Sequence, residues 1–157
     1  MLIQFQDYLS FENIYLWVNL GILPFWLVLI IIPNSKFTQI FVNSIVLPLI
    51  LSAAYVYLIY QTILLDESLL DVFKLYLSLD NLYTVFATES FLLVFWLHFL
   101  ALNLFLGSWI SRDGVKYNMS RGLVSVPIIL VYFTGPLGLV LYWIIRVFYA
   151  KRLGFHD

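Results

Sequence analysis

Residues 90–110 form the stretch SFLLVFWLHFLALNLFLGSWI, which contains no charged side chain in 21 consecutive positions. A helix needs about 20 predominantly apolar residues to cross a bilayer, because each residue advances the helix by about 1.5 Å. The stretch is therefore predicted to be a membrane-spanning helix.

Three further stretches of the same kind are found at residues 14–32, 38–65 and 124–149. Across the whole chain, 63% of the residues are hydrophobic and 11% are charged, whereas a soluble domain is about half apolar and about a quarter charged. We predict an all-α, polytopic membrane protein, a four-helix transmembrane bundle that forms one domain over residues 1–157. Eight basic and nine acidic residues, with no cysteine, exclude a nucleic-acid-binding protein and a disulfide scaffold.

Residues 69–87 are apolar but carry a narrow polar stripe at spacings of three and four residues, formed by Asp71, Lys74, Ser78 and Asn81. Such a pattern predicts an amphipathic helix between the second and third spans, lying in the membrane interface with its polar edge toward water. A fifth span is the alternative.

The predicted topology is multi-pass. The residues before Ile14 carry no basic side chain and no small-residue cleavage site, so no cleavable signal peptide is expected there. Basic residues are divided almost evenly between the two sides that four spans create, and Lys36 after the first span favours both termini outside. Exposed aromatic faces on small spans favour association into a homo-oligomer.

Three of the four predicted spans contain a proline: Pro24, Pro48 and Pro136. Because proline lacks an N–H and clashes with the preceding turn, each is expected to kink its helix and to free a backbone carbonyl. Kinked helices can pack tightly or can open a cavity, and the sequence leaves both interpretations open.

Polar side chains inside the predicted spans are few, and in a bilayer such residues usually face the bundle interior or a functional cavity. His98 shares a helix face with the apolar residues Phe91, Leu102, Phe105 and Trp109. Since imidazole exchanges protons near neutral pH, His98 is a candidate general acid or base. A hydrogen bond from His98 to a neighbouring carbonyl is the alternative.

Asn103 is expected on a different face of the same helix, beside Trp96 and Gly107. It is a candidate for binding a ligand, although hydrogen bonding between helices is the ordinary role of asparagine in membranes.

The predicted fourth span has a face formed by Gly135, Gly138, Tyr142, Arg146 and Tyr149. The two glycines would let a flat ligand or another backbone come close. Arg146 lies near the end of this span, where its guanidinium is expected to reach a lipid phosphate.

Two acidic residues flank the third span. Asp113, followed by Gly114, predicts a turn after that span. Glu89 directly precedes it, where the positive end of the helix dipole favours a carboxylate, and it could reach the polar end of a ligand.

Motifs for metal-dependent and nucleotide-dependent chemistry are missing from the sequence. It contains no HxxxH, HxxHH or CxxC pattern and no glycine-rich phosphate loop before a helix. We therefore expect no cofactor and no metal, which leaves acid–base chemistry on an apolar substrate or binding alone.

The second half of the chain resembles the abscisic-acid-deficient-4-like family of small membrane proteins. The resemblance is carried by WLHFLALNLFLG at residues 96–107, by Asp113, and by TGPLG at residues 134–138. Matches such as Asn19 and Tyr55 extend it over about residues 14–146. Plant members of this family are linked to the formation of neoxanthin from violaxanthin in plastid membranes.

The resemblance implies a protein embedded in a bacterial inner membrane or a plastid membrane, which modifies a carotenoid or a related isoprenoid. We expect a cofactor-free isomerase that uses acid–base chemistry on an epoxycarotenoid-like polyene. The expected catalytic residues are His98, Asn103, Glu89 and Tyr142. The expected substrate-binding residues are Asn19, Tyr55, Trp96, Phe105, Trp109, Gly135, Gly138 and Arg146.

Two other functions remain open at this point. One is a non-catalytic membrane subunit that binds a carotenoid or lipid and supports a partner enzyme or pigment protein. The other is a small transporter or channel, for which the kinked helices are the only motive. The isomerase and the non-catalytic subunit both require an apolar polyene or lipid ligand.

Overall fold

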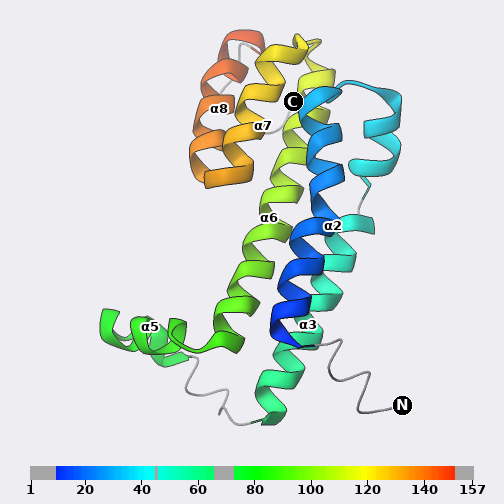
Figure 1. Cartoon of the computed structure of the whole chain (residues 1–157). Helices are drawn as coiled ribbons and strands as arrows, with labels where there is room; N and C mark the ends of the chain where they lie inside the picture. The colour runs from blue at the N-terminus through cyan, green and yellow to red at the C-terminus, as the bar shows by residue number, and fades with distance from the viewer. Residues whose placement is uncertain (1–9, 45, 66–72, 151–157) are drawn as a thin grey trace, which may run out of the picture. The chain divides into compact units, whose positions relative to one another are not determined.

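Helices form the whole of the regular structure in the computed structural model, which describes residues 10–44, 46–65 and 73–150 (Figure 1). The elements in chain order are α2 (Phe11–Ile31), the π-helical turn η1 (Thr38–Val42), α3 (Val46–Leu65), the 3-10 turn η2 (Lys74–Tyr76), α5 (Leu79–Phe86), α6 (Glu89–Lys116), α7 (Arg121–Thr134) and α8 (Pro136–Ala150). Three segments in this part of the chain are long and apolar enough to cross a membrane: Phe11–Ile31, Thr38–Gln61 and Glu89–Lys116. The prediction of an all-helical, membrane-type fold is confirmed, with three candidate spans in place of four.

The chain divides into two compact units, and the helices α2 and α6 each contribute to both. Unit 1 consists of Met1–Gly21 and Leu49–Phe99, and unit 2 of Ile22–Pro48 and Leu100–Asp157. Each unit is described by itself below. The expectation of a single domain stays a prediction.

Unit 1 is held together by a small apolar core between α2, α3 and α6. Its buried members are Ile14 of α2, Leu58 of α3, and Leu93, Val94 and Leu97 of α6. The three α6 residues follow one another at helical spacing and so face the same neighbours. Burying such side chains stabilises a helix contact through close packing, which is the main force between helices in lipid.

The segment between α3 and α6 is not one continuous amphipathic helix, so that prediction is wrong. Ser78 has an extended backbone, with φ −159° and ψ 157°, and its hydroxyl accepts a hydrogen bond from the N–H of Asn81 as the N-cap of α5. A serine in this role ends one helical segment and begins the next. Neither η2 nor α5 is long enough to span a membrane. Asp71 of the predicted polar stripe lies outside the described residues. The position of this segment in the membrane interface stays a prediction.

The fourth predicted span, residues 124–149, is instead a hairpin of the two helices α7 and α8, which lie side by side (Figure 1). The chain turns at Gly135, whose φ of +59° lies in the region that favours glycine. Pro136 occupies the first position of α8, where its missing N–H has no acceptor to lose. Helices of 14 and 15 residues are about 21–23 Å long, and a bilayer core is about 30 Å thick.

The structure also changes the prediction that Pro24, Pro48 and Pro136 each kink a helix. Pro136 is the first residue of α8 and does not bend a continuous helix, and Pro48 lies in the first turn of α3. Pro24 lies inside α2 as expected, and Pro127 lies inside α7. Two of the three predicted mid-helix kinks are therefore wrong, because helices begin at those prolines or just before them.

Unit 2 is tied together at one end by hydrogen bonds to the connection after α2. The Pro33 carbonyl accepts a hydrogen bond of 2.6 Å from the Ser111 hydroxyl of α6 and one of 3.1 Å from the Gln39 amide. The Asn34 amide donates to the carbonyl of Met119, just before α7, at 3.0 Å. The end of α2, the end of α6 and the start of α7 therefore meet at one end of unit 2.

The hairpin predicts a membrane topology that cysteine labelling can test. The natural sequence has no cysteine, so Lys36→Cys and Tyr149→Cys each introduce a single thiol. Because α7 and α8 together leave and return to the same end of unit 2, we expect a membrane-impermeant maleimide to label both variants from the same side of sealed vesicles.

The variant Phe133→Cys, close to the turn between α7 and α8, is the matched control and should resist labelling from either side. Four spans would place Tyr149 across the membrane from Lys36. Labelling of the two cysteines from opposite sides would therefore contradict the hairpin topology.

Candidate functional site

An open groove of about 590 Å³ lies in unit 1 between the first turns of α2 and α6. Its walls are mostly apolar, and its residues are Phe11, Glu12, Tyr15, Leu16, Glu89, Leu92, Leu93 and Trp96. Cavities of this size, with apolar walls and few polar groups, are typical of small-molecule binding sites.

The aromatic wall of the groove is fixed by contacts between α2 and α6. The Trp96 indole N–H donates a hydrogen bond of 3.2 Å to the side-chain oxygen of Asn19. The Asn19 amide in turn donates to the Tyr15 carbonyl at 2.7 Å, which orients its oxygen toward the indole. The Tyr15 and Trp96 rings lie 6.1 Å apart, and Phe99 stacks on Trp96 at 5.5 Å. A tryptophan held at both its polar and its apolar edge forms a rigid surface for a flat ligand.

Two carboxylates, Glu12 and Glu89, line the same groove. Each lies in the first turn of its helix, where the positive end of the helix dipole stabilises a negative charge. The groove thus combines an apolar wall with two groups that can accept or donate a proton. Glu89 was predicted from the sequence, whereas Glu12 was not, because nothing in the sequence indicates that two helix starts 77 positions apart are neighbours.

His98 is an exposed side chain of α6 that does not belong to the groove residues. Its ring lies 6.0 Å from the ring of Tyr55 on α3. The structure therefore brings together two of the predicted site residues here, but not around an enclosed crevice. A catalytic role for His98 stays a prediction.

The remaining predicted site residues belong to unit 2. Phe105 is exposed, and Trp109 meets the Tyr142 ring edge-on at 5.5 Å between centroids. Asn103 is buried beside Gly135, where an added methyl group would lie 2.6 Å from the Asn103 side-chain oxygen. The predicted residues are thus distributed over several local clusters in the two units.

Tyr142 and Arg146 meet an acidic partner that the sequence did not assign to them. The Asp113 carboxylate accepts a hydrogen bond of 2.7 Å from the Tyr142 hydroxyl and forms an ion pair of 2.7 Å with Arg146 Nε. Arg146 also donates to the Tyr117 hydroxyl at 3.2 Å, and its guanidinium lies over the Trp143 ring at 5.2 Å. These contacts define a buried charged cluster between α6 and α8.

This cluster corrects two predictions. Asp113 lies in the last turn of α6 and not in a turn after the span, and Arg146 is 1% exposed, so it does not extend to a lipid phosphate. A buried charge requires a partner of opposite sign. The two residues are 33 positions apart, and only the hairpin of α7 and α8 brings them together.

Among the residues that the structure describes, no group of three or more histidine, cysteine or acidic side chains could hold a metal ion.

The fold and the groove define a class of protein: a helical membrane protein with three candidate spans, a short helical hairpin and an apolar groove that carries carboxylates. A family model described as ABA DEFICIENT 4-like matches residues 13–142, and the chain belongs to this family. The resemblance seen in the sequence is thereby confirmed. The protein ABA DEFICIENT 4, chloroplastic, of Arabidopsis thaliana is 27% identical over 129 residues, which cover 80% of this chain and 57% of that relative. No solved structure matches the chain.

The buried cluster yields a prediction about stability. Replacing Asp113 with Asn leaves the Arg146 charge buried without its counter-ion, and removing one partner of a buried pair costs about 3–5 kcal/mol. We expect Asp113→Asn to lower the thermal unfolding temperature of the detergent-solubilised protein strongly, as followed by circular dichroism.

The double variant Asp113→Leu/Arg146→Met should regain most of this loss, because replacing both charges with apolar groups is often close to neutral. Arg112→Gln, at an exposed neighbouring position, is the control and should leave unfolding unchanged. An Asp113→Asn protein as stable as the wild type would show that the ion pair does not hold α8 in place.

Proposed function

We propose that this protein binds a carotenoid or a related isoprenoid polyene in the groove between α2 and α6 and isomerises it by acid–base chemistry without a cofactor. The single observation that carries the proposal is that one apolar groove presents two carboxylates, Glu12 and Glu89. Membership of the ABA DEFICIENT 4-like family supports the substrate class. The chain spans 57% of the length of the curated relative it matches, so the activity is argued here from its own residues.

The groove suits a long, flat hydrocarbon. The Tyr15 and Trp96 rings offer faces on which a conjugated chain can stack, and Leu16 and Leu92 add aliphatic contact. An apolar ligand would cover these side chains, so its affinity is expected to come mainly from the burial of apolar surface. The same contacts would fix the ligand relative to the two carboxylates.

Isomerisation of an epoxycarotenoid to an allene requires the epoxide oxygen to gain one proton and a polyene carbon to lose another. The bond between the epoxide oxygen and the ring carbon next to the polyene breaks, and the oxygen gains a proton. A proton leaves the adjacent polyene carbon, and the electron pair of that C–H bond forms the new double bond. The molecular formula is unchanged, so neither an oxidant nor a reductant is needed.

A carboxylic acid and a carboxylate can carry out these two transfers. One of the glutamates in its protonated form would donate to the epoxide oxygen, and the other in its ionised form would accept the proton from carbon. Glu89 keeps the catalytic role predicted from the sequence, and Glu12 takes the place expected for a histidine or tyrosine. The pairing of His98 with Tyr142 has no comparable support, because His98 belongs to unit 1 and Tyr142 to unit 2.

Binding without chemistry is the second candidate function, because the apolar walls of the groove serve both. A non-catalytic subunit would hold a polyene and present it to a partner enzyme or pigment protein. Under that hypothesis the glutamates would orient the polar end of the ligand and would transfer no proton.

The test is pigment analysis in a bacterial host that makes epoxycarotenoids. We expect cells with the wild-type protein to accumulate an isomer of the epoxycarotenoid that is absent from cells with an empty vector. Glu89→Gln and Glu12→Gln keep the size of the side chain but remove the proton-transferring group. Loss of one acid–base group should slow the conversion by about 10²–10⁴-fold.

Asp80→Asn is the matched control, since Asp80 is an exposed acidic residue of α5 in the same unit but not a groove residue. It should retain full conversion. Purified protein that carries unchanged pigment in stoichiometric amount, in a host with no new isomer, would contradict the isomerase and favour the binding subunit.

A further inference from the structure

We propose that the turn between α7 and α8 forms a second ligand site, which binds an oxygen atom of an apolar molecule through the Asn103 side-chain amide. The expected ligand class is an isoprenoid with a hydroxyl or carbonyl group. This site belongs to unit 2, whereas the groove belongs to unit 1, and it does not depend on the isomerase chemistry.

The turn is separated from the end of unit 2 by the full length of α7. The helix α7 begins at Arg121, near the end of unit 2 where Asn34 binds the Met119 carbonyl. Fourteen helical residues carry the chain about 21 Å from that end. If that end meets the membrane surface, Gly135 and Pro136 lie inside the hydrocarbon core, which is about 30 Å thick.

Irregular backbone at membrane depth is tolerated only where protein covers it or where it lines a cavity. The Asn103 side chain lies directly against the turn, because an added methyl group at Gly135 would come within 2.6 Å of its oxygen. Asn103 is 6% exposed, and its Nδ2 atom has no hydrogen-bond partner. A buried amide donor without an acceptor costs about 1–3 kcal/mol, so an acceptor brought by a ligand would recover that energy.

The start of α8 brings the N–H groups of Leu137 and Gly138 to the same turn, since Pro136 has none and the Leu139 N–H donates to the Gly135 carbonyl at 3.2 Å. The first N–H groups of a helix have no acceptor within the helix, and Pro136 occupies the first position. Interrupted membrane helices commonly direct such N-termini at polar groups of a substrate.

The Trp26 indole of α2 is a further buried donor in unit 2. The benzo side of the Trp26 ring packs on Gly107, four residues after Asn103, with Cζ3 3.0 Å from the position of an added methyl group. The indole Nε1 of Trp26 is buried and also lacks a hydrogen-bond partner. This part of unit 2 therefore has an excess of donors, and a matching ligand must supply an acceptor.

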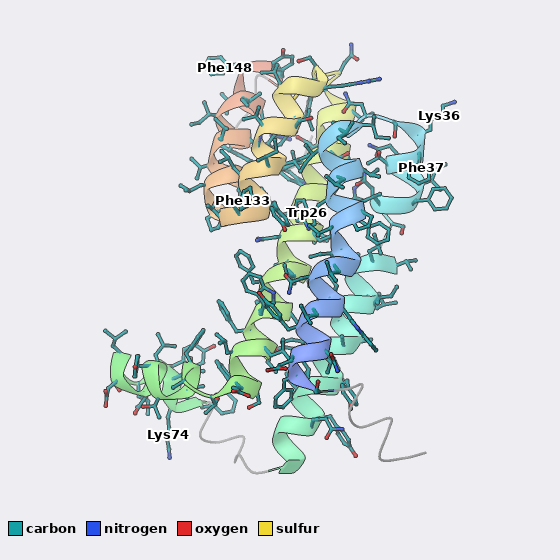
Figure 2. All side chains as sticks on the ribbon, viewed as in Figure 1. Trp26, Lys36, Phe37, Lys74, Phe133 and Phe148 are labelled. Carbon is teal, nitrogen blue, oxygen red and sulfur yellow. The ribbon has the colours of Figure 1, made fainter. Side chains whose placement is uncertain are left out.

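The surroundings of the turn indicate that the rest of the ligand is apolar. Phe133 and Leu137, which flank the turn, are 69% and 62% exposed. Figure 2 shows Phe133 at the turn end of the hairpin. Arg146, the basic residue of α8, lies ten positions after Pro136 and is paired with Asp113. An isoprenoid alcohol or ketone fits this combination of apolar surface and donors, whereas a phosphate would lack a cation.

The test compares farnesol with farnesene, which share an isoprenoid skeleton but differ in a hydroxyl group. Dissociation constants are obtained from the ligand-induced rise in the unfolding temperature of the detergent-solubilised protein. We expect the wild type to bind farnesol about three- to tenfold more tightly than farnesene, the range for one or two added hydrogen bonds. Asn103→Leu, of similar size, should abolish this preference without lowering the stability of the ligand-free protein.

Val115→Leu, at an exposed position on the same helix, is the control and should keep the preference. If Asn103→Leu does not fold, Asn103→Asp preserves the shape but removes the amide donor, and it should likewise lose the preference. Equal affinities of the wild type for farnesol and farnesene, as expected if only a water occupies the turn, would overturn the proposal. An Asn103→Leu protein that still prefers farnesol would also overturn it. Retained farnesol preference in Glu89→Gln would separate this site from the groove.

Discussion

The ion pair between Asp113 and Arg146 is the interaction on which the C-terminal part of the structure depends. Charges that leave water are tolerated only when each finds a partner of opposite sign and further hydrogen bonds. Here Tyr142 and Tyr117 supply those hydrogen bonds, so the carboxylate of α6 and the guanidinium of α8 satisfy each other. The pair fixes the last turns of α8 against α6, and the close contact of Gly138 with α7 then positions the first turns.

Acidic side chains have different surroundings in the two units. Acidic side chains at the starts of α2 and α6 line an apolar groove in unit 1, where a ligand can approach them. In unit 2, the carboxylate of Asp113 at the end of α6 is bound by Tyr142 and Arg146 and has a structural role. Acidic side chains thus line an open groove in one unit and stabilise helix packing in the other, and the difference comes from what the neighbouring helix offers.

Much of the helical architecture could be predicted from the sequence, because apolar runs of about 20 residues report directly on membrane-spanning helices. The failure at residues 124–149 has a physical cause: hydropathy does not distinguish one long helix from two short ones that fold back. Gly135 followed by Pro136 was the available signal, since glycine permits the left-handed turn and proline favours the first helical position. The neighbourhoods of Glu12 and Asp113 could not be predicted, because both depend on contacts between distant parts of the chain.

The carbonyl groups at the end of α2 draw their partners from far along the chain. The Ile30 carbonyl accepts from Ser125 of α7, and the Pro33 carbonyl accepts from Ser111 of α6. Because α2 and α3 are translated before α6 and α7, these oxygens lack their final partners until the second half of the chain has been made. The hydrogen bonds at the end of α2 therefore form late in assembly, after α6 and α7 have been made.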